Sequence, residues 1–118
     1  MIDTVKIIET NLAEVRMKIG SNAEASGRTA ADVKLVAVCK YFGSDVTAAV
    51  VAAGCGEIGE NRPQALWSKA LELSSLDVRF HQIGHLQRNK VRRTIGCIDM
   101  LHAGDSLRLL NSISAESV

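Results

Sequence analysis

The run Leu35-Val36-Ala37-Val38-Cys39 is continuously apolar and leads directly into Lys40. It is partly β-branched and too short to be stable as a free-standing helix. Apolar runs of this length are typical of parallel strands that are covered on both faces. We therefore predict a buried parallel strand over residues 35–39.

A helix is predicted ahead of this strand, over residues 3–26. Its apolar residues recur every three or four positions, so they share one helix face; they are Val5, Ile8, Leu12, Val15 and Ile19. Gly27 follows as the expected C-terminal cap.

Strands and helices alternate after residue 34. Further strands are predicted at residues 57–59, 78–83 and 97–101, and helices at residues 46–53, 63–73 and 87–95 and beyond residue 106. The expected helix boundaries are Ser44 as an N-cap, Gly54 as a closing glycine, Pro63 in a first turn, and Gly104-Asp105-Ser106 as the cap of a last helix carrying Leu107, Leu110 and Ile113. This alternation implies a parallel sheet with right-handed crossovers.

Two architectures have this order of elements. A doubly wound sheet would place a glycine-rich phosphate turn after its first strand, where this chain has Lys40-Tyr41-Phe42-Gly43. A (β/α)8 barrel typically needs about 250 residues. The 118 residues of this chain would supply about half of one.

The composition is that of one globular domain close to neutrality. Fourteen Lys and Arg against 13 Asp and Glu give a net charge of +1, so we expect neither a nucleic acid nor a membrane surface as a partner. No run approaches the roughly 18 uninterrupted apolar residues of a membrane span. The three cysteines (Cys39, Cys55 and Cys97) are odd in number and widely spaced, which favours a reducing compartment and a cytoplasmic location.

Lys40 is the first candidate for chemistry. Because strand side chains alternate between faces, Lys40 shares one face with Val36 and Val38. Cys39 lies on the other face as a small hydrophobe under a helix. Lys40 also stands at the carboxyl end of the strand, where barrel enzymes place their active sites. Valine neighbours would disfavour its charged form and make the neutral amine a nucleophile for a Schiff base. The alternative is a lysine that caps the strand and reaches solvent.

Three motifs with ordered spacing contain this lysine and the segments after it. They are Leu35-Val36-Ala37-Val38-Cys39-Lys40-Tyr41, then Gly59-Glu60-Asn61 with Gln64, then His81-x-Ile83-Gly84-His85-Leu86-Gln87 with Asn89-Lys90. Together they resemble the pyridoxal 5′-phosphate (PLP) homeostasis proteins of the YggS/PROSC type, which are related to the barrel domain of alanine racemase. The resemblance implies a barrel, PLP as cofactor, a Schiff base at Lys40, and a non-catalytic role in binding, buffering or delivering PLP.

The chain departs from that family in sequence at two places and in length. It has Cys39 where serine is common, and Arg62-Pro63 where the family has Tyr-Val or similar residues. Because of its length, we predict the N-terminal half of a TIM-type (β/α)8 barrel, an α/β fold with about four parallel β/α units. It is expected to form one domain over residues 1–118, with the helix at residues 3–26 and the β/α units at residues 34–118.

Two consequences follow from half a barrel. The loops that would hold the cofactor phosphate follow the last two strands of a full barrel, so this chain would keep PLP mainly through the covalent bond. Its outer strands would be open edges and its inner face would expose Val and Ile. We therefore expect a homodimer or a swapped assembly that closes eight strands.

Several other side chains have two interpretations each. Asn61 follows the second strand and either contacts the cofactor or caps the helix that Pro63 opens. His81 and His85 either touch the cofactor ring or hydrogen-bond neighbouring loops. A zinc site from these histidines and His102 has no supporting ligand spacing, so no metal is expected.

Three functions remain open from the sequence. The favoured one is a PLP carrier without turnover. A PLP-dependent racemase needs an acid–base group on each face of the cofactor, and Tyr41, the only tyrosine, is expected to point away from Lys40 by alternation. The third is an engineered or truncated half-barrel fragment with no activity of its own.

Overall fold

The structure, a computed structural model, describes residues 2–102 and 114–115. Its elements are α1 (Ile2–Ala25), the 3-10 turn η1 (Ala30–Asp32), β1 (Ala37–Val38), α2 (Ser44–Ala52), β2 (Glu57–Glu60), α3 (Pro63–Glu72), β3 (Arg79–Gln82), the 3-10 turn η2 (Arg88–Lys90), α4 (Val91–Ile95) and β4 (Met100–Leu101). The last predicted helix, with Leu107, Leu110 and Ile113, lies outside the described residues.

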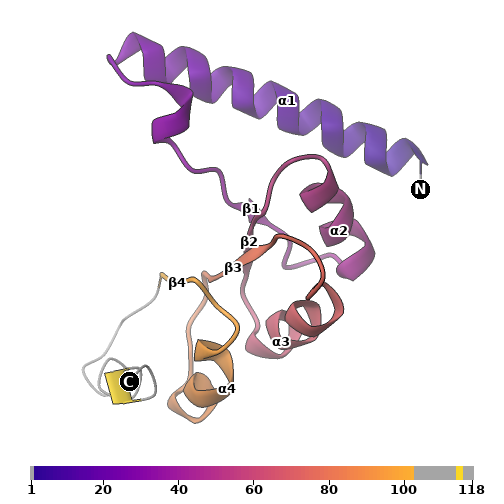
Figure 1. The fold of residues 1–118 in the computed structure, drawn as a ribbon, viewed down its shortest axis with the longest axis vertical. Coiled ribbons are helices and arrows are strands. Elements are labelled where there is room, and N and C mark those ends of the chain that lie inside the picture. The colour runs from indigo at the N-terminus through magenta and orange to yellow at the C-terminus, as the bar shows by residue number, and fades with distance from the viewer. Residues whose placement is uncertain (1, 103–113, 116–118) are drawn as a thin grey trace.

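The four strands form one parallel sheet in the order β1-β2-β3-β4. Helices α2, α3 and α4 lie on the same side of this sheet, and α1 lies beside the β1–α2 end (Figure 1). Sequential strands that pair in chain order, each followed by a helix on one side, are the arrangement of a barrel segment. The predicted α/β half-barrel with a preceding helix is confirmed.

Helix α1 packs through the apolar stripe that the sequence predicts. Ile8 and Leu12 face Ala37 and Val50 across a groove between α1 and the β1–α2 unit. The Arg16 guanidinium donates a hydrogen bond of 2.7 Å to the carbonyl of Gly54 and fastens the helix to the end of α2. Gly27 has a φ of +79°, which glycine adopts without a steric penalty, so the helix ends where the sequence predicts.

Strands β1 and β4 are both shorter than predicted. Strand β4 covers Met100–Leu101 instead of residues 97–101. Strand β1 covers Ala37–Val38 instead of residues 35–39, because it pairs with β2 alone and only over two residues. The expectation of cover on both faces was wrong, since the Val38 residue is 50% exposed. Ser44 is the first residue of α2 and not its cap, and Gly43 holds the N-cap position.

The core lies between the sheet and its helices. Its buried residues are Cys39, Ile58, Leu66, Leu73 and Phe80. The parallel register explains this set, because Ile58 pairs with Phe80 and their side chains share one face of the sheet. The opposite face carries Val38, Gly59, His81 and Met100, which are aligned by the same register. Met100 is 50% exposed there, so the inner face is open as the half-barrel predicts.

Candidate functional site

Lys40 stands in a tight turn just past β1. The amide of Phe42 donates to the carbonyl of Cys39 at 3.1 Å, which closes a turn that contains Lys40 and Tyr41. The Lys40 Nζ lies 5.1 Å from the centroid of the Tyr41 ring. The expectation that these two side chains point apart was wrong, because the strand ends at Val38 and alternation no longer applies. Both side chains are exposed, so the described residues do not supply the low-dielectric surroundings expected for Lys40.

Asn61 follows the carboxyl end of β2, the strand that pairs with the one leading into Lys40. Val38 pairs with Gly59, and Lys40 and Asn61 each follow two residues later. The N-cap of α3 is Arg62, so the helix-capping interpretation of Asn61 is wrong. Its backbone carbonyl accepts a hydrogen bond of 2.8 Å from the Gln82 amide, which ties the ends of β2 and β3 together.

The loop after β3 approaches Asn61 so closely that it requires a glycine. A side chain at Gly84 would overlap the side-chain oxygen of Asn61 and would lie 2.8 Å from its backbone oxygen. His85 follows in this loop and is exposed. Lys40, Asn61 and His85 thus belong to three successive strand ends on one edge of the sheet.

Three apolar residues, Val36, Gly59 and Ile83, lie close together on the inner face of the sheet. A Cβ atom at Gly59 would lie 3.3 Å from the nearest Val36 methyl group and 3.4 Å from the nearest of Ile83. Glycine therefore lets Val36 and Ile83 approach across β2. Val36, Gly59 and Ile83 together form a small apolar floor on this face.

A buried ion pair lies behind the same strand ends, on the helix side. The Lys69 Nζ contacts both carboxylate oxygens of Glu60 at 3.0 Å and the carbonyl of Cys39 at 2.9 Å. The sequence analysis missed this pair, although the signal was available. Lys69 falls three residues after Leu66 and four before Leu73, in the buried stripe of α3.

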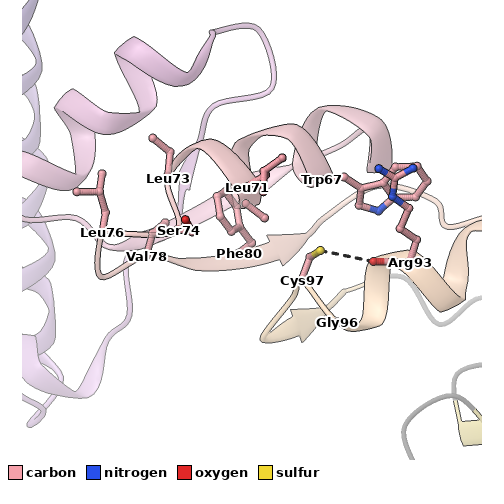
Figure 2. A pocket seen from close by; sticks show the side chains of 11 residues that line it. Trp67, Leu71, Leu73, Ser74, Leu76, Val78, Phe80, Arg93, Gly96 and Cys97 are labelled. Atoms are coloured by element: carbon pink, nitrogen blue, oxygen red, sulfur yellow. Dashed lines mark hydrogen bonds between the residues drawn. The ribbon is translucent and has the colours of Figure 1, made fainter.

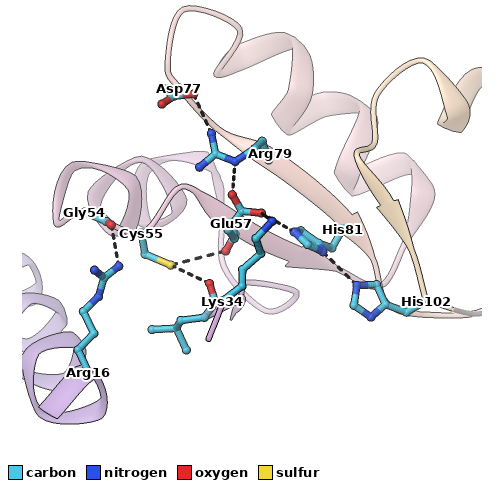
Figure 3. A network of polar contacts seen from close by, with 10 residues as sticks. Arg16, Lys34, Gly54, Cys55, Glu57, Asp77, Arg79, His81 and His102 are labelled. Carbon is cyan, nitrogen blue, oxygen red and sulfur yellow. Dashed lines mark hydrogen bonds and ion pairs between the residues drawn. The ribbon is translucent and has the colours of Figure 1, made fainter. Parts of the chain in front are cut away.

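A second polar network lies on the inner face, toward the amino ends of the strands (Figure 3). Glu57 accepts hydrogen bonds from His81 Nε2 at 2.9 Å and from Arg79, and the Lys34 ammonium lies 3.5 Å away. The second ring nitrogen of His81 lies 3.0 Å from Nε2 of His102. Both nitrogens of the buried His81 are therefore engaged, so the structure favours the hydrogen-bonding interpretation over contact with a cofactor.

This network predicts a pH-dependent contribution to stability. Burial opposes ionisation of Glu57, but the hydrogen bonds from His81 and Arg79 outweigh it and hold its pKa below the ordinary 4.5. A carboxylate with a lowered folded-state pKa stabilises the fold fully above its unfolded value and loses that contribution as the pH falls through the folded value. Glu57→Gln should therefore reduce the free energy of unfolding most above pH 4.5.

Urea unfolding of the wild type and of Glu57→Gln across the acid range measures this difference. The gap between the two proteins is expected to narrow progressively below pH 4.5. A gap that stays constant from neutral to strongly acidic pH would show that the ionised carboxylate contributes nothing.

Several known proteins are similar to this chain in sequence. The pyridoxal phosphate homeostasis protein of Mycobacterium leprae is 31% identical over 111 residues, covering 86% of this chain and 43% of the relative. That of Pseudomonas aeruginosa is 34% identical over 109 residues, covering 92% and 47%. The chain is a relative of the pyridoxal phosphate homeostasis proteins. It spans about half the length of the curated relatives it matches. No protein-family model matches it.

Solved structures are similar to this chain in fold. PipY of Synechococcus elongatus, solved with PLP bound, superposes with a TM-score of 0.79 at 31% identity. The match covers 93% of this chain and 48% of PipY. A protein of unknown function from Bifidobacterium adolescentis superposes with a TM-score of 0.86 at 28% identity, covering 98% and 51%. Each match pairs this chain with about half of a larger protein.

The departure at Cys39 from the serine expected in pyridoxal phosphate homeostasis proteins is accommodated in the core. Cys39 is buried against α2 and α3, and burial raises the pKa of its thiol, so it packs as a small hydrophobe.

Across residues 2–102 and 114–115, no group of three or more His, Cys, Asp or Glu side chains is placed to hold a metal. No helix among the described residues is long and apolar enough to cross a membrane.

A groove of about 480 Å³ lies on the helix side of the sheet, between α3 and α4 (Figure 2). Trp67 borders it, with its indole nitrogen 2.9 Å from the Thr94 hydroxyl and the Arg93 guanidinium 4.4 Å above its ring. Trp67 thus packs against α4. Lys40 and Asn61 do not line this groove, so it is separate from the strand ends that carry them.

Proposed function

We propose that this chain binds PLP covalently through Lys40 and serves as a non-catalytic carrier of the cofactor. The observation that carries the proposal is the position of Lys40 and Asn61 just past two adjacent strand ends, each two residues beyond the Val38–Gly59 pair, on a sheet whose inner face has the floor of Val36, Gly59 and Ile83. Kinship with pyridoxal phosphate homeostasis proteins, and PipY with PLP bound, support the same ligand.

The residues present suit one end of the cofactor. PLP would supply an electrophilic aldehyde carbon, and the Lys40 amine would hold it through a Schiff base, with the loss of one water. The Asn61 amide can hydrogen-bond a polar substituent of the ring, and His85 is placed on the next loop. The floor would pack against the ring face. Among these residues, the bond to Lys40 would be the strongest attachment of PLP.

Titration with PLP, followed by borohydride reduction and peptide mass mapping, tests the proposal. We expect a single reduced adduct on Lys40 that saturates at one PLP per chain. Labelling scattered over many lysines, or no labelling, would contradict the proposal and assign cofactor binding to a longer protein.

We further propose that two copies pair to close the barrel. The exposed inner-face residues Val38 and Met100 and the open edge of β1 favour a second set of four strands. An apolar groove beside that edge, lined partly by Ile7 and Phe42, would be covered by the same pairing. Light scattering should give twice the chain mass of 12.7 kDa. A monodisperse monomer at working concentration would rule out the pairing.

The carrier is favoured over a PLP-dependent racemase by the position of Tyr41. Racemisation needs acid–base groups on opposite faces of the cofactor, whereas Tyr41 lies on the same turn as Lys40 with its ring beside the ammonium. Conversion of one alanine enantiomer into the other in the presence of PLP would reverse this ranking.

The free cysteines Cys39, Cys55 and Cys97 support a cytoplasmic location.

A further inference from the structure

Lys69 is a buried lysine that the proposed function leaves without a role. Its side chain is 5% exposed and that of its partner Glu60 is 0% exposed. A buried ion pair is seldom a gain in stability, because removing two charges from water offsets their attraction. Stability alone therefore does not explain why an ion pair is buried on the helix side of the strand ends that carry Lys40 and Asn61.

The hydrogen bond from Lys69 to the Cys39 carbonyl supplies this explanation. Its ammonium donates to the carbonyl of Cys39, and the same carbonyl accepts the Phe42 amide that closes the turn. This carbonyl belongs to the peptide bond that leads into Lys40. The hydrogen bond from a charged donor is stronger than one from a neutral donor, so Lys69 fixes the orientation of the peptide from which the Lys40 side chain projects.

The other partner of Lys69 is attached to the second site residue. Glu60 immediately precedes Asn61 and accepts two of the three contacts of the ammonium. The Lys69 ammonium thus contacts both the peptide group that precedes Lys40 and the Glu60 side chain that precedes Asn61. Lys69 therefore fixes the spacing between the ends of β1 and β2 from the helix side of the sheet.

We infer that Lys69, with its charge balanced by Glu60, is a positioning residue that sets the approach of the Lys40 amine to PLP. This inference rests on the proposed function, since it concerns the same site. It assigns no contact between Lys69 and the cofactor. Lys69 acts through the backbone of the turn, and small misplacements of a reacting group can cost on the order of a hundredfold in rate.

The test uses the double variant Lys69→Met with Glu60→Gln, which removes the cation without leaving a buried charge unpaired. The readout is the rate of PLP adduct formation at Lys40, followed by absorbance across pH and confirmed by borohydride trapping. We expect the adduct to form at least about tenfold more slowly at every pH, with Lys40 still the labelled residue. Rates are compared at equal folded fraction, measured by circular dichroism.

Glu57→Gln is the matched control, because it makes the same carboxylate-to-amide change at the opposite end of β2, away from the Lys40 turn. It is expected to lose stability without slowing the adduct. If the double variant does not fold, Lys69→Gln with Glu60→Gln replaces it, with the same slowing expected, because glutamine is too short to reach both partners.

The two possible failures are distinguishable. If wild-type protein is not labelled at Lys40, the proposed function fails. If wild-type protein is labelled, and the double variant reacts at the wild-type rate with the same pH profile, PLP binding stands and the positioning role of Lys69 is wrong.

Discussion

Lys40→Met is expected to abolish the borohydride-trapped PLP adduct. Methionine keeps the length and the apolar stem of the lysine but has no amine that can condense with an aldehyde. Because Lys40 is exposed in a turn and does not belong to the buried core, the variant should fold as the wild type does. Mass mapping should show loss of the modified peptide, with residual labelling at the background level of surface lysines.

Lys6→Met is the control for this experiment. Lys6 is exposed on α1 and does not line the groove that Ile7 shares with Phe42, so its loss should leave one PLP bound per chain. An adduct of undiminished stoichiometry in Lys40→Met would contradict the assignment. Loss of labelling in both variants would point to a general effect on folding, which circular dichroism would detect.

Leu66→Ala is expected to lower the free energy of unfolding by about 2–5 kcal/mol. Leu66 is 0% exposed and packs within the cluster of Ile58, Phe80 and Leu73 between α3 and the sheet. Its truncation removes buried apolar surface and leaves a cavity that the surrounding strands cannot fill. A loss of this size is a large part of the stability of a small domain, about 5–15 kcal/mol.

Leu71→Ala provides the matched comparison in the same helix. Leu71 is 79% exposed, so the same change there should alter the free energy of unfolding by no more than about 0.5 kcal/mol. Urea unfolding of both variants measures the difference. Equal losses at the two positions would mean that α3 does not pack on the sheet through the face described.

The order of elements could be predicted from the sequence because it depends on local patterns. The apolar run before Lys40, the glycines at positions 27 and 54 and the proline at position 63 indicate which segments form strands and helices. Alternation of these elements restricts the topology to a parallel sheet with helices on its faces. The alignment of Lys40 with Asn61 follows from the same order, since successive parallel strands end at one edge.

The details of the site could not be predicted, because they depend on contacts between distant segments. The exposure of Lys40 and its position beside Tyr41 result from the early end of β1, which pairs on one side only. The burial of Lys69 required α3 to lie across β2, where Glu60 could compensate its charge.

The sequence alone thus determined which elements form and in what order, through periodicity, glycine conformations and helix boundaries that operate within a few residues. Tertiary structure alone decided which polar groups are paired. His81 joins Glu57 and His102 across three strands, and Lys69 joins Glu60 to the Cys39 carbonyl. Partners separated by 9 to 30 residues meet only when the sheet forms, because burial then makes an unpaired charge too costly.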